Sequence, residues 1–313
     1  MGPRILITGA TGFIGGRVAA TAAAANEPAH VRLLARRPLD PPPGASVELA
    51  PGDLRDPDSL RRACEGVDVL IHCASAIGAD EDTAHAVNDR GTRALVDAAV
   101  RAGVTRIVSL STASVHGRGP FRAAAPGTLP LAPGSATSRT RAAGERYVLD
   151  AGGTVLRPHL VYGTGDRQLM PGVVRLLAAL PGPLDGGSSL HSLIDVDSLA
   201  RALFGAALSP RTEPGAFYVN HPEPVPAAEL LAAGEALVAG RSGTRGPAVD
   251  LAEARVLLAD VPFGLHHLAM LADDHWFEDD RPWRDWGCDP GPGFAATIAG
   301  HMPWYRGLLV PSS

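Results

Sequence analysis

Lysine is absent from this chain of 313 residues, and all 28 of its basic residues are arginine. The absence excludes Schiff-base catalysis and any phosphate-binding loop that depends on a lysine. It equally excludes a mechanism in which an internal lysine tunes a neighbouring acid. A coding bias toward alanine, arginine, glycine and proline accounts for part of the absence, but it does not restore the chemistry that lysine provides.

Tyrosine and cysteine are scarce as well. The four tyrosines are Tyr147, Tyr162, Tyr218 and Tyr305, so each can be weighed individually as an acid or base. The three cysteines are odd in number and lack CxxC spacing, which argues against a disulfide framework and against a zinc site. We therefore expect no bound metal and a reducing, cytoplasmic location.

A basic excess and long apolar runs are also missing. The formal net charge is −5, whereas nucleic-acid binding requires clustered positive charge, so we expect no nucleic acid among the partners. No apolar stretch approaches the roughly 20 residues of a spanning helix, and no charged leader precedes a cleavage site, so we expect no membrane association. A composition with 45% apolar and 19% charged residues is that of a soluble globular protein, whose oligomeric state stays open.

Short apolar runs alternate with helix-like stretches through the first half of the chain. The predicted strands are Ile5–Thr8, Val31–Ala35, Val47–Leu49, Val67–Ala74, Arg106–Leu110 and Thr154–Val161. The predicted helices are Ile14–Ala25, Pro57–Glu65, Ala86–Ala102 and Arg139–Leu149. This alternation predicts right-handed crossovers and a doubly wound parallel sheet of the α/β class.

The pattern changes at two places. Between Gly117 and Ser135 the periodicity fails, which is typical of a long loop that is either disordered or a lid. After Val161 the pattern is less regular, with helices expected near Gln168–Ala179, Val196–Ala207 and Ala227–Val238. Proline and glycine clusters at Pro41–Gly44 and Pro222–Pro226 indicate turns.

These changes predict two units. We expect a Rossmann domain at residues 1–160, whose sheet and helices are partly completed by residues 192–210. Residues 161–313 then form mainly a smaller, substrate-binding lobe.

The strongest motif lies at the junction of the first predicted strand and helix. It consists of Thr8, Gly9, Ala10, Thr11, Gly12, Phe13, Ile14 and Gly15. Glycines at such a turn let the backbone approach a pyrophosphate, whose charge then lies at the free N–H groups of a helix N-terminus. A glycine triplet alone is weak evidence, but the strand before it and the helix after it indicate a dinucleotide site.

The end of the second strand selects between NAD and NADP, because an acidic residue there binds the ribose 2′-hydroxyl of NAD. This chain instead has Arg36 and Arg37. Guanidinium groups suit a 2′-phosphate, so we expect NADP, with NADPH as the hydride donor. The alternative is that the two arginines form only a solvated strand end.

Two further segments belong to the expected cofactor site. Asp53 and Leu54 follow the third strand, where Asp53 contacts the adenine amino group, caps the helix that starts near Asp56, or does both. The fourth strand ends in small residues that either line the pyrophosphate crevice or are small only for close packing: Cys73, Ala74 and Ser75.

Taken along the whole chain, these motifs resemble the extended short-chain dehydrogenase/reductase family. The resemblance continues at Val87–Thr92, Ser111–Gly117, Leu156–Gly163, Asp195–Ala200 and Met302–Arg306. It implies a Rossmann fold, a nicotinamide cofactor and additional cofactor contacts from Ser111, Arg141, Pro158 and Leu160.

The chemistry of that family rests on a Ser or Thr, a Tyr and a Lys, the last two spaced Tyr-x-x-x-Lys on one helix. By the resemblance, these catalytic positions correspond to Thr112, Thr137 and Arg141. The register follows from Glu145, which matches the glutamate usual in that helix, and from the interval of 25 residues between the two threonines. The chain therefore departs from the family at both the proton donor and its partner cation.

No tyrosine obviously replaces the missing one. Tyr147 lies ten residues further on and is expected to pack on the sheet, and Tyr162 reaches the pocket only from another side. Tyr218 and Tyr305 are expected in the second lobe. Threonine hydroxyls are poor acids, and a guanidinium does not release its proton at neutral pH.

The proton must then come from water, from His116 or His159, or from the substrate. We favour a phenol beside the ketone, as in aromatic polyketides, in a pocket roofed by residues 117–135 and by Trp276, Trp283 and Trp286. The alternative for the tryptophans is ordinary core packing of the small lobe.

The sequence thus predicts an NADPH-dependent ketoreductase that acts on an angucyclinone-like aromatic ketone in antibiotic biosynthesis. Two other functions stay open. One is a catalytically silent NADP(H)-binding regulator, which would keep the cofactor site without turning over ketones. The other is a nucleotide-sugar epimerase or dehydratase, which would need a base that Thr137 cannot supply.

Overall fold

A seven-stranded parallel sheet forms the centre of the protein. The computed structural model describes residues 2–25, 30–38, 40, 47–238, 246–262 and 264–309. The strand order is β11-β7-β5-β4-β1-β2-β3, and every pairing is parallel. The strands are β1 (Arg4–Thr8), β2 (His30–Ala35), β3 (Val47–Pro51), β4 (Val69–His72), β5 (Arg106–Leu110), β7 (Thr154–Arg157) and β11 (Gly215–Tyr218). The predicted doubly wound α/β class is confirmed, whereas the turn expected at Pro41–Gly44 lies outside the described residues.

The central strands are continuous apolar runs because both faces of the sheet are covered. All four positions of β4 are buried. Along β1, Ile5 and Ile7 pack into one layer and Leu6 into the other, since successive side chains of a strand alternate between faces. The strand order reverses between β1 and β4, so their carboxyl ends flank the crevice in which such sheets bind ligands.

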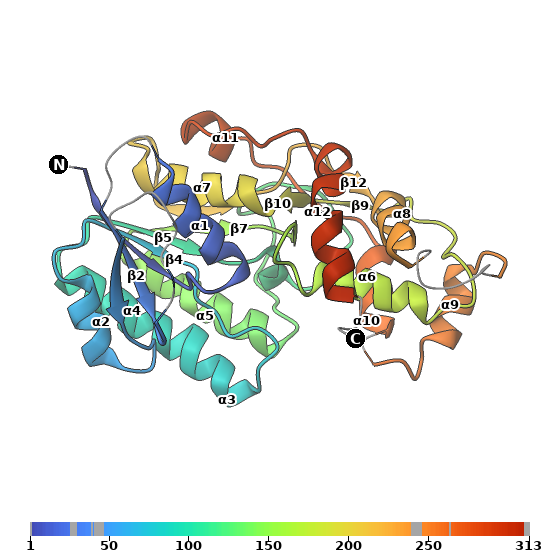
Figure 1. Ribbon diagram of the computed structural model, residues 1–313, viewed down its shortest axis with the longest axis horizontal. Coiled ribbons are helices and arrows are strands. Elements are labelled where there is room, and N and C mark those ends of the chain that lie inside the picture. The colour runs from blue at the N-terminus through green and yellow to red at the C-terminus, as the bar shows by residue number, and fades with distance from the viewer. Residues whose placement is uncertain are drawn as a thin grey trace.

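Helices cover both faces of the sheet, as Figure 1 shows: α1 and α7 lie on one face, and α2, α4 and α5 on the other. Their bounds are α1 (Phe13–Ala23), α2 (Pro57–Cys64), α4 (Thr92–Arg101), α5 (Ala136–Asp150) and α7 (Val196–Leu208). The start of α2 follows from its sequence. Asp56 Oδ1 accepts the Asp58 N–H at 3.1 Å, and Pro57 fills the first position, where no N–H is needed.

A second group of helices lies at the other end of the molecule (Figure 1). These are α6 (Leu169–Ala178), α8 (Ala227–Val238), α9 (Leu251–Leu257), α10 (Gly264–Ala272) and α12 (Phe294–Leu309). They enclose a separate apolar core that includes Met170, Leu177, Leu230 and Tyr305. The short helix α11 (Arg281–Asp285) instead contacts α7 and β11. The helices expected near Gln168–Ala179, Val196–Ala207 and Ala227–Val238 are confirmed.

Two small sheets connect this group to the main sheet. β8 (Leu160–Tyr162) pairs with β10 (Leu193–Asp195). The other sheet joins β12 (Val225–Pro226), β9 (Leu190–His191), β13 (His275–Phe277) and β6 (Phe121–Ala124).

The structure corrects two predicted elements. The single strand expected at Thr154–Val161 is two strands, because β7 ends before Pro158, which has no N–H to give to the main sheet, and β8 joins a different sheet. The helix expected at Ala86–Ala102 begins earlier, with α3 (Glu81–Ala84), and passes through a π-helical turn, η1 (His85–Gly91), before α4.

Two segments also lie elsewhere than expected. Gly117–Ser135 is not a structureless loop, because β6 within it pairs with β13. Tyr218 does not belong to the second lobe, since it ends β11, the edge strand of the main sheet. Both differences come from pairings between residues far apart in the chain.

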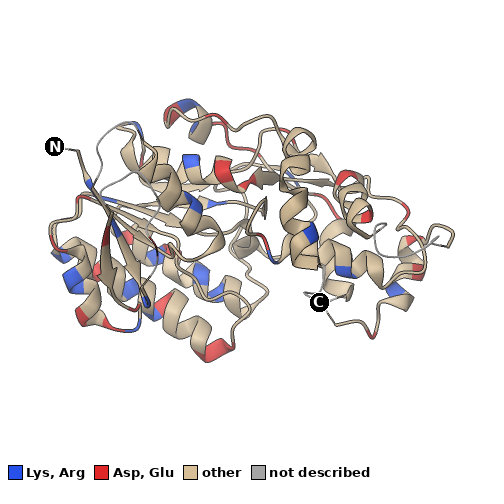
Figure 2. Cartoon of the chain, in the orientation of Figure 1, with Lys and Arg blue, Asp and Glu red and all other residues tan. Residues whose placement is uncertain are grey.

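Charged side chains of both signs are interspersed over the helices of both ends of the molecule (Figure 2). In the part of the chain that the structure describes, no helix has the length and apolar character needed to cross a membrane.

Candidate active site

The glycine-rich segment after β1 forms a tight turn. Gly9 has a φ of +76°, and its carbonyl accepts the Gly12 N–H at 2.9 Å. A Cβ added at Gly9 would lie 2.7 Å from the Ala74 nitrogen, and one at Gly15 would lie 2.2 Å from the Gly9 oxygen. Both positions therefore require glycine.

The same segment leaves a helix N-terminus open. α1 begins at Phe13 with no side-chain cap. Thr11 and Gly12 are exposed at the tip of the turn, whereas Ala10 and Ile14 pack against the core. The first N–H groups of α1 are thus available to an anion, and the residues present fit the pyrophosphate of a dinucleotide.

The end of β4 is tied to this turn by buried polar contacts. His72 Nδ1 lies 2.7 Å from Thr8 Oγ1, and His72 Nε2 lies 3.1 Å from Thr92 Oγ1. Burial lowers the pKa of His72 to about 4, so the imidazole is neutral near pH 7. The Cys73 and Ala74 backbone lies against Gly9, which supports close packing as a reason for small residues here. Their part in lining a pyrophosphate crevice stays a prediction.

Asn88, in the π-helical turn, closes the neighbouring segment. Its Oδ1 accepts from Ser75 Oγ at 3.1 Å and from the Ala76 N–H at 2.7 Å. Its Nδ2 donates to the Ala76 carbonyl at 2.9 Å and to Thr140 Oγ1 at 3.1 Å. Asn88 therefore fixes Ser75 against α5, a role that the sequence motif contained but did not assign. The place of this amide in the Val87–Thr92 motif, within a helical stretch, is the signal that could have indicated it.

Arg36 and Arg37 are exposed just beyond β2. The hydrogen bonds from Arg55 lower the pKa of Asp53, and the charge of Arg36 contributes further, so this group of side chains lies at one edge of the sheet. Arg55 Nη2 donates to Asp53 Oδ2 at 2.8 Å. The expectation that Asp53 caps α2 is wrong, because Asp56 supplies the cap. Leu54 is buried and packs near Gly91.

Thr112 lies at the carboxyl end of β5, next to the central crevice. Its Oγ1 accepts the Ser114 N–H at 3.2 Å and caps a short 3₁₀ turn, and the same hydroxyl donates to Ser114 Oγ at 3.2 Å. The preceding residue, Ser111, is buried, and its hydroxyl oxygen has no hydrogen-bond partner among the described residues. It lines a small cavity with Asn88, Arg141 and others.

α5 carries the other two predicted catalytic positions. Ser135 caps the helix in a reciprocal pair with Ser138, at 3.1 and 3.0 Å. Thr137, Arg141 and Glu145 then follow at intervals of four residues, so they share one face of the helix. Arg141 Nη2 donates to the Leu110 carbonyl at 2.9 Å, at the end of β5. Burial lowers the pKa of Arg141 to about 10, which leaves it charged near pH 7.

A buried ion pair extends this face into the main sheet. Arg157 Nε and Nη2 donate to the two carboxylate oxygens of Glu145 at 3.0 and 2.5 Å. The side chains are 10% and 3% exposed, so the pair is held in a low-dielectric site by two parallel bonds. Glu145 matches a glutamate of the family's motif, but its position in the sequence does not indicate its pairing with Arg157. This pairing joins α5 to the end of β7.

His116 lies beside that pair. Its Nδ1 donates to the Pro130 carbonyl at 2.8 Å, so its Nε2 is an acceptor and receives the Tyr218 hydroxyl at 2.9 Å. Burial lowers the pKa of His116 and raises that of Tyr218 to about 12. Both groups are neutral near pH 7 and are already hydrogen-bonded to each other. The backbone of Pro158 is fixed nearby, because its carbonyl accepts the Ala113 N–H at 2.8 Å.

The remaining tyrosines have structural partners. Tyr147 donates to Asp89 Oδ1 at 2.9 Å. The Tyr162 hydroxyl oxygen lies 2.6 Å from Thr297 Oγ1, and burial raises the pKa of Tyr162 to about 12. Tyr305 donates to Asp166 Oδ2 at 3.2 Å and accepts the Gly163 N–H at 2.8 Å.

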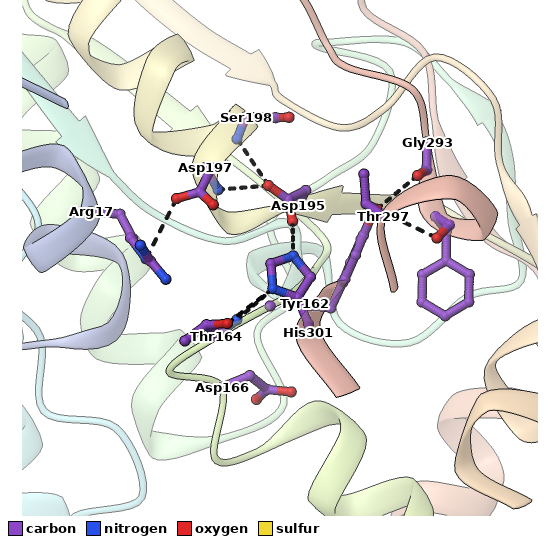
Figure 3. Close-up of polar contacts among 12 residues, drawn as sticks. Arg17, Tyr162, Thr164, Asp166, Asp195, Asp197, Ser198, Gly293, Thr297 and His301 are labelled. Atoms are coloured by element: carbon purple, nitrogen blue, oxygen red, sulfur yellow. Dashed lines mark hydrogen bonds and ion pairs between the residues drawn. The ribbon is translucent and has the colours of Figure 1, made fainter. Parts of the chain in front are cut away.

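Figure 3 shows how the segment after β8 is joined to α7 and α12. The Thr164 N–H donates to His301 Nδ1 at 3.1 Å, so the hydrogen of this imidazole is on Nε2, which donates to Asp195 Oδ2 at 2.6 Å. Asp195 Oδ1 accepts the Asp197 N–H and caps α7. Arg17 of α1 lies 3.4 Å from Asp197 (Figure 3), so these contacts connect α12, α7 and the helix of the glycine-rich turn.

The tryptophans do not form the expected roof together. Trp286 is buried against Phe217 on the main sheet, with ring centroids 5.3 Å apart, and Trp283 donates to the Asn220 carbonyl at 3.1 Å. Only Trp276, which is half-buried on β13, lies in the small sheet that contains β6. Leu160 begins β8 and is buried.

The chain is similar to known proteins in both sequence and structure. A family model described as the NAD dependent epimerase/dehydratase family matches residues 5–219. A 3 beta-hydroxysteroid dehydrogenase/Delta 5-->4-isomerase of Mycobacterium tuberculosis is 31% identical over 249 residues, which cover 71% of this chain and 66% of that protein. A 2-alkyl-3-oxoalkanoate reductase of Stenotrophomonas maltophilia is 32% identical over 250 residues, or 73% of each chain.

A solved structure shows the same fold. The dTDP-glucose 4,6-dehydratase DesIV of Streptomyces venezuelae, with NAD and TYD bound, superposes with a TM-score of 0.74 at 22% identity over 97% of each chain. The matched region spans just under two-thirds of the mycobacterial relative, and the family match extends over well more than half of this chain. The chain belongs to the NAD dependent epimerase/dehydratase family, the extended branch of the short-chain dehydrogenases and reductases.

Proposed function

We propose that the protein is an NADPH-dependent ketoreductase that reduces a ketone on an angucyclinone-like aromatic polyketide in antibiotic biosynthesis, in the cytoplasm. The observation that carries the proposal is the face of α5, where Arg141 supplies a cation beside the end of β5 and Thr137 lies four residues before it, at the position that the resemblance assigns to the family's acid. In this combination the chain resembles the ketoreductase that acts on the angucyclinone of the antibiotic simocyclinone, which also lacks the catalytic tyrosine.

The cofactor site supports the proposal. The open N-terminus of α1 and the glycine cradle fit a pyrophosphate, and exposed Arg36 and Arg37 suit the 2′-phosphate of NADP. The relatives named above include a reductase of 2-alkyl-3-oxoalkanoates and a hydroxysteroid dehydrogenase, so hydroxyl and ketone chemistry is common among them.

When bound, NADPH supplies a hydride to the carbonyl carbon of the substrate. The charged guanidinium of Arg141 stabilises the oxygen anion that develops, and the Thr112 and Thr137 hydroxyls donate hydrogen bonds to it. Thr112 donates its one hydroxyl hydrogen to Ser114 Oγ in this structure, so it must release that bond to reach the substrate oxygen; Ser114 is exposed, and water can then replace the lost partner.

The proton comes from the substrate in this proposal. A phenol next to the ketone transfers its proton to the new alkoxide, which gives the alcohol and a phenolate, and solvent then reprotonates the phenolate. The chain's own acids are poorly suited to this step, because Tyr162 and Tyr218 have raised pKa values and engaged hydroxyls. General acid catalysis by a side chain contributes about 10²–10⁴-fold, which the adjacent phenol would replace.

The test compares two ketones that differ only in that phenol. We expect the purified protein to oxidise NADPH with 8-hydroxy-1-tetralone at least about 10-fold faster than with 1-tetralone, because only the first carries an internal proton donor. The measurement is the loss of nicotinamide absorbance under matched, subsaturating ketone. Equal rates with the two ketones would contradict substrate assistance while leaving reductase activity in place.

One observation favours a second candidate, a silent NADP(H)-binding regulator. Arg141 and Thr112 each make a structural contact, to the Leu110 carbonyl and to Ser114, that a retired catalytic site would also keep. NADPH binding by calorimetry with no turnover of either tetralone, or of larger polyphenolic ketones, would favour this candidate over the reductase.

A further inference from the structure

Four buried polar atoms of His159 and its neighbours His191 and Asn220 lack hydrogen-bond partners among the described residues. They are Nδ1 and Nε2 of His159, Nδ1 of His191 and Nδ2 of Asn220. Buried polar groups in folded proteins are nearly always paired, and each unpaired one costs about 1–3 kcal/mol. A group of four in one place therefore indicates a polar partner outside the described residues, either water or a ligand group.

The group is connected to the turn that begins at Thr112. His159 directly follows Pro158, whose carbonyl is bonded to Ala113, the residue after Thr112. Its N–H donates to Asn220 Oδ1 at 2.8 Å, and Asn220 follows the strand next to β7. Both residues thus lie beyond the carboxyl ends of adjacent parallel strands, on the same edge of the sheet as the crevice between β1 and β4.

Two of the imidazoles define which atoms are donors and which are acceptors. His275 donates from Nδ1 to the Asp273 carbonyl at 3.0 Å and accepts the Gly119 N–H on Nε2 at 2.9 Å, so both of its nitrogens are used. Ser189 gives its hydrogen to the Leu271 carbonyl at 2.5 Å. Its oxygen therefore accepts from His191 Nε2–H at 3.1 Å, and His191 Nδ1 is left as an acceptor.

The unpaired atoms match a neutral group that both donates and accepts hydrogen bonds. A neutral His159 offers one N–H and one lone pair, Asn220 offers its amide hydrogens, and His191 offers a lone pair. No charged side chain is hydrogen-bonded to any of these four atoms. The pattern fits a hydroxyl group better than a carboxylate or phosphate, which would need a cation or several donors and no acceptor.

Aromatic rings surround His159. Its ring is parallel to that of His275 within 6°, with centroids 5.5 Å apart, and lies 5.5 Å from Phe277. The Phe277 ring centroid in turn lies 4.6 Å from that of Tyr218 and 5.8 Å from that of Phe121. Flat apolar faces beside a hydroxyl-binding group suit a hydroxylated aromatic ring.

A small movement changes the direction in which the His159 nitrogens point. Part of His159 is exposed, whereas its ring nitrogens face inward. The torsion that turns a histidine ring is broad and roughly twofold, so a half-turn exchanges the buried nitrogens with ring carbons.

We propose that His159, with Asn220 and His191, recognises a hydroxyl group on an aromatic ring of the substrate, separate from the carbonyl that is reduced. This inference rests on the proposed reductase function. His159 acts here as a specificity-determining residue that binds the hydroxyl by its ring nitrogens.

The test measures binding rather than turnover. The protein, saturated with NADP⁺ so that no reduction occurs, is titrated by calorimetry with 5-, 6- and 7-hydroxy-1-tetralone and with 1-tetralone. We expect at least one hydroxylated ketone to bind about 10-fold or more tightly than 1-tetralone, because a site built around a hydroxyl discriminates strongly against its loss.

Two variants assign the discrimination to His159. His159→Phe keeps the ring shape but removes both nitrogens, so it should bind all the tetralones alike, with 1-tetralone affinity unchanged. His159→Gln keeps a donor and an acceptor and should restore part of the preference. In wild type, the ¹⁵N signals of the His159 ring should shift with the preferred hydroxylated ketone and not with 1-tetralone.

Failure of this inference is distinguishable from failure of the proposed function. If wild type binds all the tetralones equally, or His159→Phe retains the preference, the inference is overturned and only water satisfies these nitrogens, whatever the turnover. If the preference and its loss are observed but NADPH is never oxidised, the binding site stands and the reductase proposal fails.

Discussion

Arginine takes the place of lysine everywhere in this protein, but its consequences differ from residue to residue. At Arg141 the guanidinium keeps a positive charge beside the end of β5 and adds a directed bond to the Leu110 carbonyl. Arg157 uses its planar fork for two parallel bonds to Glu145, which a lysine could not make. A bias toward arginine accounts for these charges, whereas the threonine at position 137 needs a different explanation.

Arg36 and Arg37 give a prediction at the same scale. Replacing both by serine should raise the KM for NADPH about 10- to 100-fold and leave that for NADH nearly unchanged, because charge-assisted bonds to the 2′-phosphate would be lost. Steady-state kinetics with both cofactors, or calorimetry if turnover is slow, gives the ratio.

The chain offers a matched control for that variant. Arg61 and Arg62 are also adjacent, exposed arginines, on α2, and their replacement by serine removes the same charge. This control should keep the preference for NADPH. If both cofactors weakened equally in the Arg36→Ser, Arg37→Ser variant, the two arginines would be only a solvated strand end.

Among the elements, α5 carries the two positions at which we infer a departure from the family's motif. Its Ser135 cap fixes where the helix begins, and its four-residue spacing places Thr137, Arg141 and Glu145 on one face. The helix is therefore intact, and the departure that we infer from the motif concerns the chemistry of two side chains rather than their placement.

Restoring the family's Tyr and Lys on α5 should reduce the preference for a ketone that carries an adjacent phenol. In the variant Thr137→Tyr with Arg141→Lys, reduction of 1-tetralone should accelerate about 10-fold or more, since a side-chain acid becomes available. Reduction of 8-hydroxy-1-tetralone should change little, because its own phenol already supplies the proton. The ratio of the two rates, measured by NADPH oxidation, should fall accordingly.

A control for that variant separates acid chemistry from bulk. Thr137→Phe with Arg141→Lys places a ring of similar size in the same position without a hydroxyl, and it should not accelerate either ketone. Equal acceleration of both ketones by the Thr137→Tyr pair would indicate a decayed ordinary site and would contradict substrate assistance.

The elements also show what a single sequence can predict. The strands and helices around the sheet were predictable because each is a local run with its own period, cap or glycine turn, as at Gly9–Gly15. β6 and β11 were not, since a four-residue edge strand has little pattern of its own and its partner is distant in sequence.

The same limit applies to the candidate site. Thr112, Thr137 and Arg141 could be placed from their spacing in a known motif. The Tyr218–His116 bond and the cluster around His159 could not, because they join residues from separate strands and loops. Sequence position carries no information about which buried polar atoms lack partners.

At the scale of the whole molecule, neutral buried histidines lie in both apolar regions. His72 is in the main sheet and His191 in the small sheet, and burial lowers the pKa of each to about 4. In the unfolded chain a histidine has a pKa of about 6.5. Between about pH 4 and 6.5 the unfolded state therefore binds more protons than the folded state, so the free energy of unfolding rises with pH across this window.

This difference predicts acid sensitivity. Each of the two histidines should cost up to about 3 kcal/mol of stability as the pH falls from about 6.5 to 4, with little further change above pH 7 from these groups. Urea unfolding followed by circular dichroism at a series of pH values measures how the free energy of unfolding depends on pH.

His72→Gln should flatten this dependence between about pH 4 and 6.5, because the titrating group is gone from both the folded and the unfolded state. Thr92→Val removes a hydrogen-bond partner of His72 but keeps the imidazole. Its free energy of unfolding should therefore be lower at every pH, with the same dependence on pH as in wild type. A His72→Gln curve parallel to that of wild type would show that this histidine is protonated in the folded protein at the same pH as in the unfolded chain.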